Sequence, residues 1–203
     1  MRHQYRNGVG WVDQEEEGTN QMMTEPLIKE TDLQFSTLTP LIRVSKIVIH
    51  HTGNSDEDGN PIDDDLSAAE IHRIHQQGLG WSGIGYHFVI RKNGTIERGR
   101  PEDCVGSHAY GYNWETLGVH LCGNFEGVDE DGNQIEPTKA QIENAAYLIG
   151  YLCDKYHLVP DKLHVVGHRD LMATACPGIG LYKQLQDIRG KAIWYMQNYQ
   201  GGD

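Results

Sequence analysis

The stretch HVVGHRDLMATACPG, residues 164–178, carries the strongest chemical signal in the chain. It opens as a short β-strand, because valine favours strands and Gly167 ends the run. His168 and Cys176 follow, and an imidazole and a thiolate on one loop are typical zinc ligands. Pro177 restricts the backbone directly after the cysteine. A catalytic zinc usually has three protein ligands, so another part of the chain should supply the third.

A second apolar stretch ends in two histidines and offers candidates for that third ligand. Residues 44–51, VSKIVIHH, are rich in β-branched side chains, which predicts a buried strand. Because side chains alternate along a strand, His50 and His51 must face opposite sides, and only one of them can face the site. Two ordinary histidines at a strand end are the alternative. The end of a rigid apolar strand nevertheless favours a ligand.

The remaining periodicities predict a single α/β domain without internal repeats. We expect elements over residues 67–77 (helix), 83–91 and 95–98 (hairpin), 116–125 (strand), 138–156 (helix) and 181–199 (helix). In the hairpin, alternation would place Tyr86 and Phe88 on the same face. His72 and His75 share a face of the first helix, where we expect histidines of the surface or of the cleft edge.

Composition excludes several classes of partner. The chain has 203 residues and a formal net charge of −12, which argues against nucleic acid and against anionic membrane surfaces. No apolar run approaches the roughly 20 residues that span a bilayer. There are four cysteines, and three remain if one binds metal, which is a poor disulfide framework. This indicates synthesis in a reducing compartment.

The N-terminal part differs in composition from the rest. Residues 1–24 are polar and charged, which predicts a tail. Scattered apolar residues over 26–40 predict a lead-in that wraps the domain, and a poorly ordered leader is the alternative. We therefore divide the chain into a tail and lead-in, 1–40, and a catalytic domain, 41–200. The first residues contain no apolar segment typical of a secretory signal, so we expect synthesis in the cytoplasm.

Four stretches, in order, resemble the type 2 N-acetylmuramoyl-L-alanine amidases, which include phage lysozyme-amidases and animal peptidoglycan recognition proteins. They are IVIHHTG around His50, GYHFVIRKNGTIERGR over 85–100, the run from SHA to LGVHLCGNF over 107–125, and VGHRDLMATACPG over 166–178. The resemblance implies a mixed β-sheet flanked by helices, with a zinc cleft along one edge. It also implies that the zinc ligands are His50, His168 and Cys176.

The resemblance assigns further roles by position. The catalytic tyrosine of the family falls on Tyr86. Some phage members carry a catalytic lysine where this chain has Thr174, and related amidases carry a glutamate where it has His120. Tyr86 and Thr174 would then donate hydrogen bonds to the oxyanion or hold the attacking water, and His120 would move the proton or orient a ligand. His108 and Asn113 are candidates for contact with the muramyl-peptide.

The implied activity is hydrolysis of the amide bond between N-acetylmuramic acid and L-alanine. A zinc with three protein ligands lowers the pKa of bound water to roughly 7. We expect a monomer that acts on peptidoglycan or muropeptides in the cell wall, as a phage or prophage lysin would. The alternatives are a peptidoglycan receptor without catalysis and a structural zinc domain. The sequence disfavours a receptor without catalysis, because such receptors usually lack the cysteine or the tyrosine, and this chain has both Cys176 and Tyr86.

Overall fold

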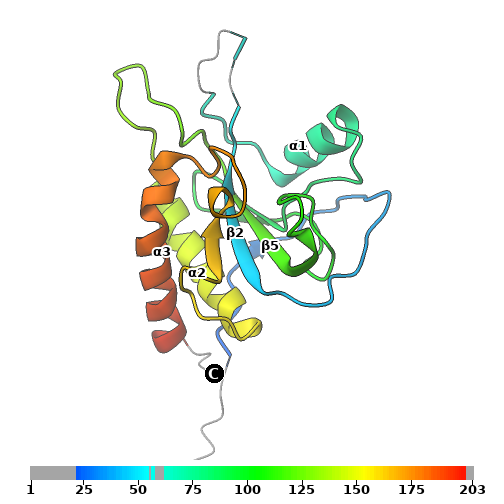
Figure 1. Ribbon diagram of the computed structural model, residues 1–203, viewed down its shortest axis with the longest axis vertical. Helices are drawn as coiled ribbons and strands as arrows, with labels where there is room; N and C mark the ends of the chain where they lie inside the picture. Colours follow the sequence, from blue (N-terminus) through cyan, green and yellow to red (C-terminus); the bar gives the residue numbers. More distant parts are fainter. Residues whose placement is uncertain (1–21, 55, 58–61, 200–203) are drawn as a thin grey trace, which may run out of the picture.

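The computed structural model describes residues 22–54, 56–57 and 62–199. The tail predicted over 1–24 therefore lies almost entirely outside the described residues. The described part forms a three-layer arrangement, in which a twisted sheet separates one helix from two others (Figure 1). No helix in this part of the chain combines the length and the apolar character needed to cross a bilayer.

Six strands form one mixed sheet with the order β1-β4-β3-β5-β2-β6. β4 pairs antiparallel with β3, and every other pair is parallel. This confirms the predicted mixed sheet. The strands are β1 (Ile28–Lys29), β2 (Lys46–His51), β3 (Phe88–Ile90), β4 (Ile96–Arg98), β5 (Thr116–Leu121) and β6 (Val165–Gly167).

Two of the helices begin at capping boxes, in which the cap residue and the residue three positions later exchange hydrogen bonds. Ser67 caps α1 (Ala68–Arg73), which continues as one π-helical turn, η1 (Ile74–Gly78). Thr138 caps α2 (Lys139–Lys155) and exchanges two bonds with Gln141. α3 (Ile179–Asn198) follows the loop that contains Cys176 and packs along α2.

The two faces of the sheet are covered differently. Helices α2 and α3 cover one face, and the apolar side chains of β2, β3 and β5 pack against them as the main core. Helix α1 covers part of the other face with a smaller apolar cluster that includes Ile71 and Val89. The strands β2 and β5 run parallel, so their carboxyl ends meet at one edge, where ligands bind in many α/β folds.

The lead-in is attached to the domain from residue 23 onward. Met23 is buried, and its N–H donates to the carboxylate of Asp154 on α2 at 2.6 Å. The hydroxyl of Tyr147 donates to the carbonyl of Thr24 at 3.1 Å. β1 then adds to the sheet beside β4. The lead-in is thus part of the fold where the structure describes it.

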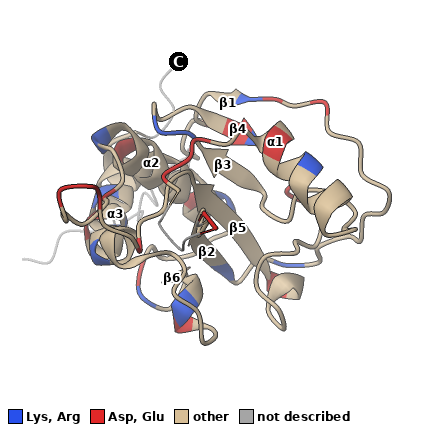
Figure 2. Ribbon diagram, turned by 90° about the horizontal axis from the view of Figure 1, so that it is seen from above, with Lys and Arg blue, Asp and Glu red and all other residues tan. Residues whose placement is uncertain are grey.

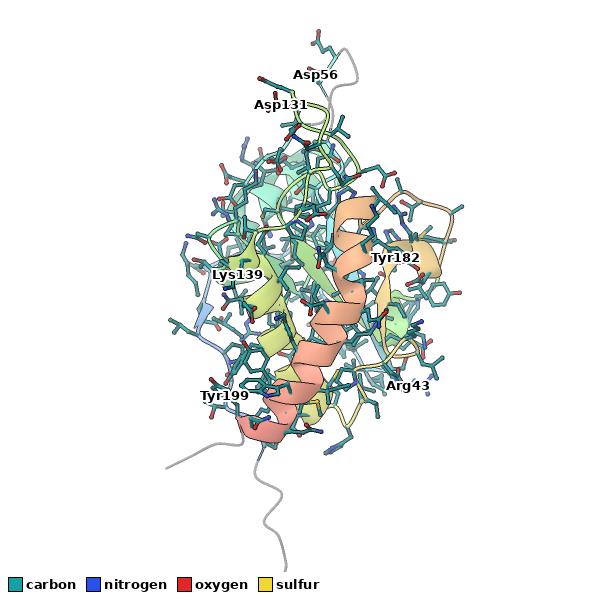
Figure 3. All side chains as sticks on the ribbon, turned by 90° about the vertical axis from the view of Figure 1, so that its left-hand side faces the viewer. Arg43, Asp56, Asp131, Lys139, Tyr182 and Tyr199 are labelled. Atoms are coloured by element: carbon teal, nitrogen blue, oxygen red, sulfur yellow. The ribbon has the colours of Figure 1, made fainter. Side chains whose placement is uncertain are left out.

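Charged residues surround the end of the molecule at which β2 and β5 finish. Asp56 and Asp131, on the two loops that follow these strands, project from the same end (Figure 3). Basic and acidic residues are interspersed over the layer formed by α2 and α3 (Figure 2).

Candidate active site

Three predicted ligands from distant parts of the chain meet at this edge. His50 is the penultimate residue of β2, His168 begins the 3-10 turn η3 (His168–Asp170) after β6, and Cys176 lies on the following loop. One donor atom from each lies within 4.8 Å of the other two, and no other such group of three occurs among the described residues. His50 Nδ1 is 3.5 Å from Cys176 Sγ, and the rings of His50 and His168 are 4.5 Å apart.

Backbone and side-chain bonds hold the loop in place. The N–H of Arg169 donates to the carbonyl of Cys176 at 2.9 Å. The N–H of Cys176 donates to the hydroxyl of Thr174 at 3.2 Å, and the Arg169 guanidinium pairs with Glu126 at 2.9 Å. Gly178 closes the loop at φ 84°, and a side chain there would collide with the backbone of Phe125.

Burial controls the protonation of the donors. It lowers the pKa of His50 well below its ordinary value, with His108 as the next contribution, and it lowers the pKa of His168. Burial also raises the pKa of the Cys176 thiol to about 12. A thiolate therefore forms here only beside a compensating cation. Two neutral imidazoles and one sulfur form a donor set that is compatible with zinc.

His51 lies on the opposite face, as strand alternation predicts. Its ring stacks on Phe125 at 6.1 Å, and its Nδ1 accepts the Phe125 N–H at 3.1 Å. Of the two adjacent histidines, His50 alone joins the cluster.

Tyr86 lies on the same face of the sheet as His50, which strand alternation does not predict. Its ring lies 5.1 Å from that of His50 and stacks on that of His120 at 4.6 Å. Phe88 packs in the main core on the other face, so the prediction that Tyr86 and Phe88 share a face is wrong. The reason is that β3 begins only at Phe88, and the chain before it is irregular. Burial raises the pKa of Tyr86, so its hydroxyl stays protonated.

From the sequence we expect His72 and His75 at the surface or at the cleft edge; His72 is instead buried, whereas His75 is half-buried beside Tyr86. His72 is buried, and its Nδ1 accepts the N–H of Ile84 at 3.2 Å. His75 Nδ1 accepts the N–H of Gly85 at 3.1 Å, and its ring lies 5.7 Å from that of Tyr86. Both side chains thus hold the segment that delivers Tyr86. Their i, i+3 spacing on one helix face is the sequence signal that could have indicated a shared structural role.

His120 lies beside His50 on the neighbouring strand, in direct register. Its Nε2 is 2.9 Å from the hydroxyl of Thr52, whereas its Nδ1 has no hydrogen-bond partner among the described residues. Burial lowers the pKa of His120 to about 3, so the ring is neutral at physiological pH. An unpartnered buried nitrogen beside the candidate ligands is a group that requires an explanation.

The two predicted substrate-binding residues have partners inside the protein. His108 Nδ1 is 2.9 Å from His50 Nε2, and the side chain is only 8% exposed. The side-chain oxygen of Asn113 accepts the N–H groups of His108 and Ala109 at 2.9 and 2.8 Å. Their contact with a substrate stays a prediction, as does the catalytic role of Thr174.

The comparisons with known proteins agree on one family. The sequence profile of the N-acetylmuramoyl-L-alanine amidase family matches residues 40–179. The chain therefore belongs to the N-acetylmuramoyl-L-alanine amidase family.

Relatives in this family include both lytic and recognition proteins. The endolysin of Enterobacteria phage K11 is 39% identical over 119 residues, which cover 59% of this chain and 74% of the endolysin. The peptidoglycan recognition protein of Trichoplusia ni is 31% identical over 147 residues, which cover 70% of this chain and 74% of that protein. The solved structure of N-acetylmuramoyl-L-alanine amidase LysC from Clostridium intestinale is 36% identical and superposes with a TM-score of 0.68. The matched region covers 82% of this chain and 97% of LysC.

Proposed function

We propose that this protein is a zinc-dependent peptidoglycan amidase that hydrolyses the bond between N-acetylmuramic acid and L-alanine. The observation that carries the proposal is the convergence of His50, His168 and Cys176 beside the protonated hydroxyl of Tyr86. His120 Nδ1, which has no hydrogen-bond partner within the described part of the chain, lies next to them. The family membership and the endolysin relatives support the reaction class. We further propose that the protein acts on the cell wall as a monomer.

The three donors are the residues that would hold the metal. When bound, zinc polarises the scissile carbonyl and makes hydroxide available near neutral pH. Three protein donors leave one coordination position open, which distinguishes a catalytic from a structural zinc. The absence of a fourth His, Cys, Asp or Glu in the cluster, within the described part of the chain, therefore favours catalysis over a structural role.

Tyr86 is the proposed oxyanion donor. Its raised pKa keeps the hydroxyl protonated, so it can donate a hydrogen bond to the oxygen that becomes negative in the transition state. The Thr174 hydroxyl oxygen accepts the Cys176 N–H, which leaves its own O–H available to donate to the same oxygen. Both hydroxyls approach from rigid supports, because Tyr86 is held by stacked rings and Thr174 by the ligand loop.

His120 is the proposed acceptor that orients the attacking water. The Thr52 oxygen lies 2.9 Å from His120 Nε2, and His120 Nδ1 has no hydrogen-bond partner among the described residues. We assign the proton of the neutral ring to Nε2, where it donates to the Thr52 oxygen, so that Nδ1 carries a lone pair. A water that donates to this lone pair is held with its own lone pair turned toward the carbonyl carbon. The same nitrogen can return the proton to the leaving amine.

The direct test is hydrolysis of a defined muropeptide, N-acetylmuramoyl-L-alanyl-D-glutamate extended by its stem peptide. Mass spectrometry should detect the peptide with a free L-alanine N-terminus together with free N-acetylmuramic acid. Cys176→Ala should lose both zinc and cleavage. The matched control is Cys104→Ala, because Cys104 is a half-buried free cysteine outside the cluster and should retain both.

The experiment also separates catalysis from recognition. Relatives named peptidoglycan recognition proteins make binding without cleavage the second reading. A zinc-loaded parent protein that binds the muropeptide but leaves the amide intact would contradict the proposed amidase. Cleavage at another bond, seen as a different peptide mass, would contradict the assigned bond specificity.

A further inference from the structure

We propose that His108 and Thr116 form a buried hydrogen-bond chain that selects which nitrogen of His50 is presented to the metal. His108 is then a positioning residue rather than a residue that touches the substrate. The inference deepens the proposed zinc site and rests on it. All of its members lie among the described residues.

The hydrogen-bond chain runs from His50, the metal ligand, inward to a backbone carbonyl. His50 Nε2 lies 2.9 Å from His108 Nδ1, and His108 Nε2 lies 3.4 Å from the hydroxyl oxygen of Thr116. The Thr116 hydroxyl donates to the carbonyl of Tyr112 at 2.9 Å. His50 is 1% exposed and Thr116 is fully buried, so water does not compete for these bonds.

The carbonyl at the end of the hydrogen-bond chain determines which nitrogen of each imidazole carries the proton. The carbonyl of Tyr112 can only accept, so the Thr116 hydroxyl donates to it, and the Thr116 oxygen is then an acceptor. His108 therefore carries its proton on Nε2 and keeps a bare Nδ1. That nitrogen accepts the N–H of His50 Nε2, which leaves the lone pair of His50 on Nδ1. His50 Nδ1 is the atom that faces Cys176 Sγ at 3.5 Å.

The opposite arrangement would disable the ligand. If His108 carried its proton on Nδ1, His50 Nε2 would have to accept it. A neutral His50 would then carry its own proton on Nδ1, where it would block the position that faces the cysteine. The buried threonine hydroxyl thus decides between a tautomer that can bind metal and one that cannot.

The ring of His108 is held so closely that it cannot turn away. A side chain at Gly106 would lie 2.5 Å from His108 Cδ2, and one at Gly118 would lie 2.7 Å from His108 Cγ. The two glycines therefore form a slot for the imidazole. The Asn113 side chain accepts the backbone N–H of His108 at 2.9 Å and holds the slot from the loop side. This restraint reduces the freedom that the ligand would lose on binding metal.

Mutation of a residue that hydrogen-bonds a metal-ligating histidine typically weakens metal binding by about 10–100-fold. The first experiment measures the zinc dissociation constant of the full chain by competition with a chromophoric chelator. His108→Leu should weaken zinc binding by about 10–100-fold. His108→Asn should stay close to the parent, because the side-chain oxygen of asparagine can replace Nδ1 as the acceptor. Thr116→Val should weaken binding and Thr116→Ser should not.

A matched control separates positioning from general destabilisation. Gln141 is a fully buried polar residue of α2, which covers the other face of the sheet from His50, and its side-chain amide donates to the carbonyls of Ile90 and Cys122. Gln141→Leu should lower the thermal midpoint but leave the zinc affinity unchanged. If His108→Leu folds and binds zinc as tightly as the parent, the proposal is overturned.

The second experiment reads the protons directly and needs no metal. Long-range ¹H–¹⁵N correlation spectra of the imidazoles should show His108 protonated on Nε2 alone and His50 protonated on Nε2. A proton on His108 Nδ1 would overturn the proposal even if zinc binds. A parent protein that takes up no zinc would instead contradict the proposed function. The NMR spectra would still show the direction of the hydrogen bonds between His50, His108 and Thr116. If His108→Leu does not fold, Thr116→Val and these spectra carry the test.

Discussion

The two faces of the central sheet are built from alternate residues of the same strands, yet they hold different interactions. On the face under α2 and α3, Ile49 and Val119 are fully buried in an apolar core. On the other face, the neighbouring His50 and His120 are equally buried but bond to a second imidazole and to a threonine. The difference indicates that one face supplies stability through apolar contacts and the other positions chemical groups.

The largest expected effect is on the apolar face. Phe88 is fully buried in the main core, so Phe88→Ala should lower the free energy of unfolding by about 3–5 kcal/mol. Urea denaturation measures this change, and the zinc affinity of the folded variant should equal that of the parent. Leu79→Ala, at a 55% exposed position, should change stability by less than about 0.5 kcal/mol. If both variants lost a similar amount of free energy of unfolding, the assignment of Phe88 to the stabilising core would be contradicted.

On the other face, Tyr86→Phe should affect the reaction and leave stability nearly unchanged. Loss of one oxyanion donor typically lowers kcat by about 10²–10³, or about 2.7–4 kcal/mol in the barrier. The measurement is kcat at equal zinc content, with Tyr110→Phe as control because Tyr110 is 87% exposed. If the Tyr86→Phe variant hydrolyses the substrate at the parent rate, Tyr86 is not the oxyanion donor and Thr174 is the remaining candidate.

A smaller effect concerns pH and the buried histidines. Burial lowers the pKa of His87 to about 4, below the ordinary value of about 6.5. Between these values the unfolded chain binds a proton that the folded chain does not, so stability falls as pH decreases from 6.5 toward 4. The slope from one such histidine is at most about 1.4 kcal/mol per pH unit.

Denaturation of the zinc-loaded parent and of His87→Asn over this pH range measures the difference. The asparagine oxygen can still accept the Gly118 N–H but does not titrate. The variant should therefore show a shallower decline in stability. Identical slopes would contradict the account of His87.

The smallest expected effect lies at the end of α2. His157 has φ 55°, and its N–H and that of Leu158 close the helix onto Asp154 and Cys153. This is the geometry that favours glycine, so His157→Gly should raise the free energy of unfolding by about 0.5–1 kcal/mol. Thermal or urea denaturation gives the value, and zinc affinity should not change. A decrease in stability with glycine, relative to His157→Ala, would contradict this interpretation.

Local patterns predicted the parts of the fold that depend on neighbouring residues. The capping boxes at Ser67 and Thr138 mark helix starts because both partners lie three residues apart. Strand alternation separated His50 from His51 because β2 is regular to its end. The loop between His168 and Cys176 is short enough to bring both donors to one place.

Contacts that depend on register or on irregular backbone were not predictable. Tyr86 lies on the other face from Phe88 because no regular strand connects them. The bonds from His72 and His75 to the turn before Tyr86 require knowledge of how α1 packs. The proposed role of His108 depends on the fold of the loop before β5, which places its ring between His50 on β2 and Thr116 on β5.

The central claim is that His50, His168 and Cys176 together hold one zinc ion. X-ray absorption at the zinc edge of the loaded protein tests it most directly. We predict one zinc per chain with a single sulfur at about 2.3 Å and two imidazole nitrogens at about 2.0–2.1 Å. Cys176→Ala should remove the sulfur contribution, and Cys104→Ala should not. A spectrum without sulfur, or with two or more sulfurs, would contradict the account.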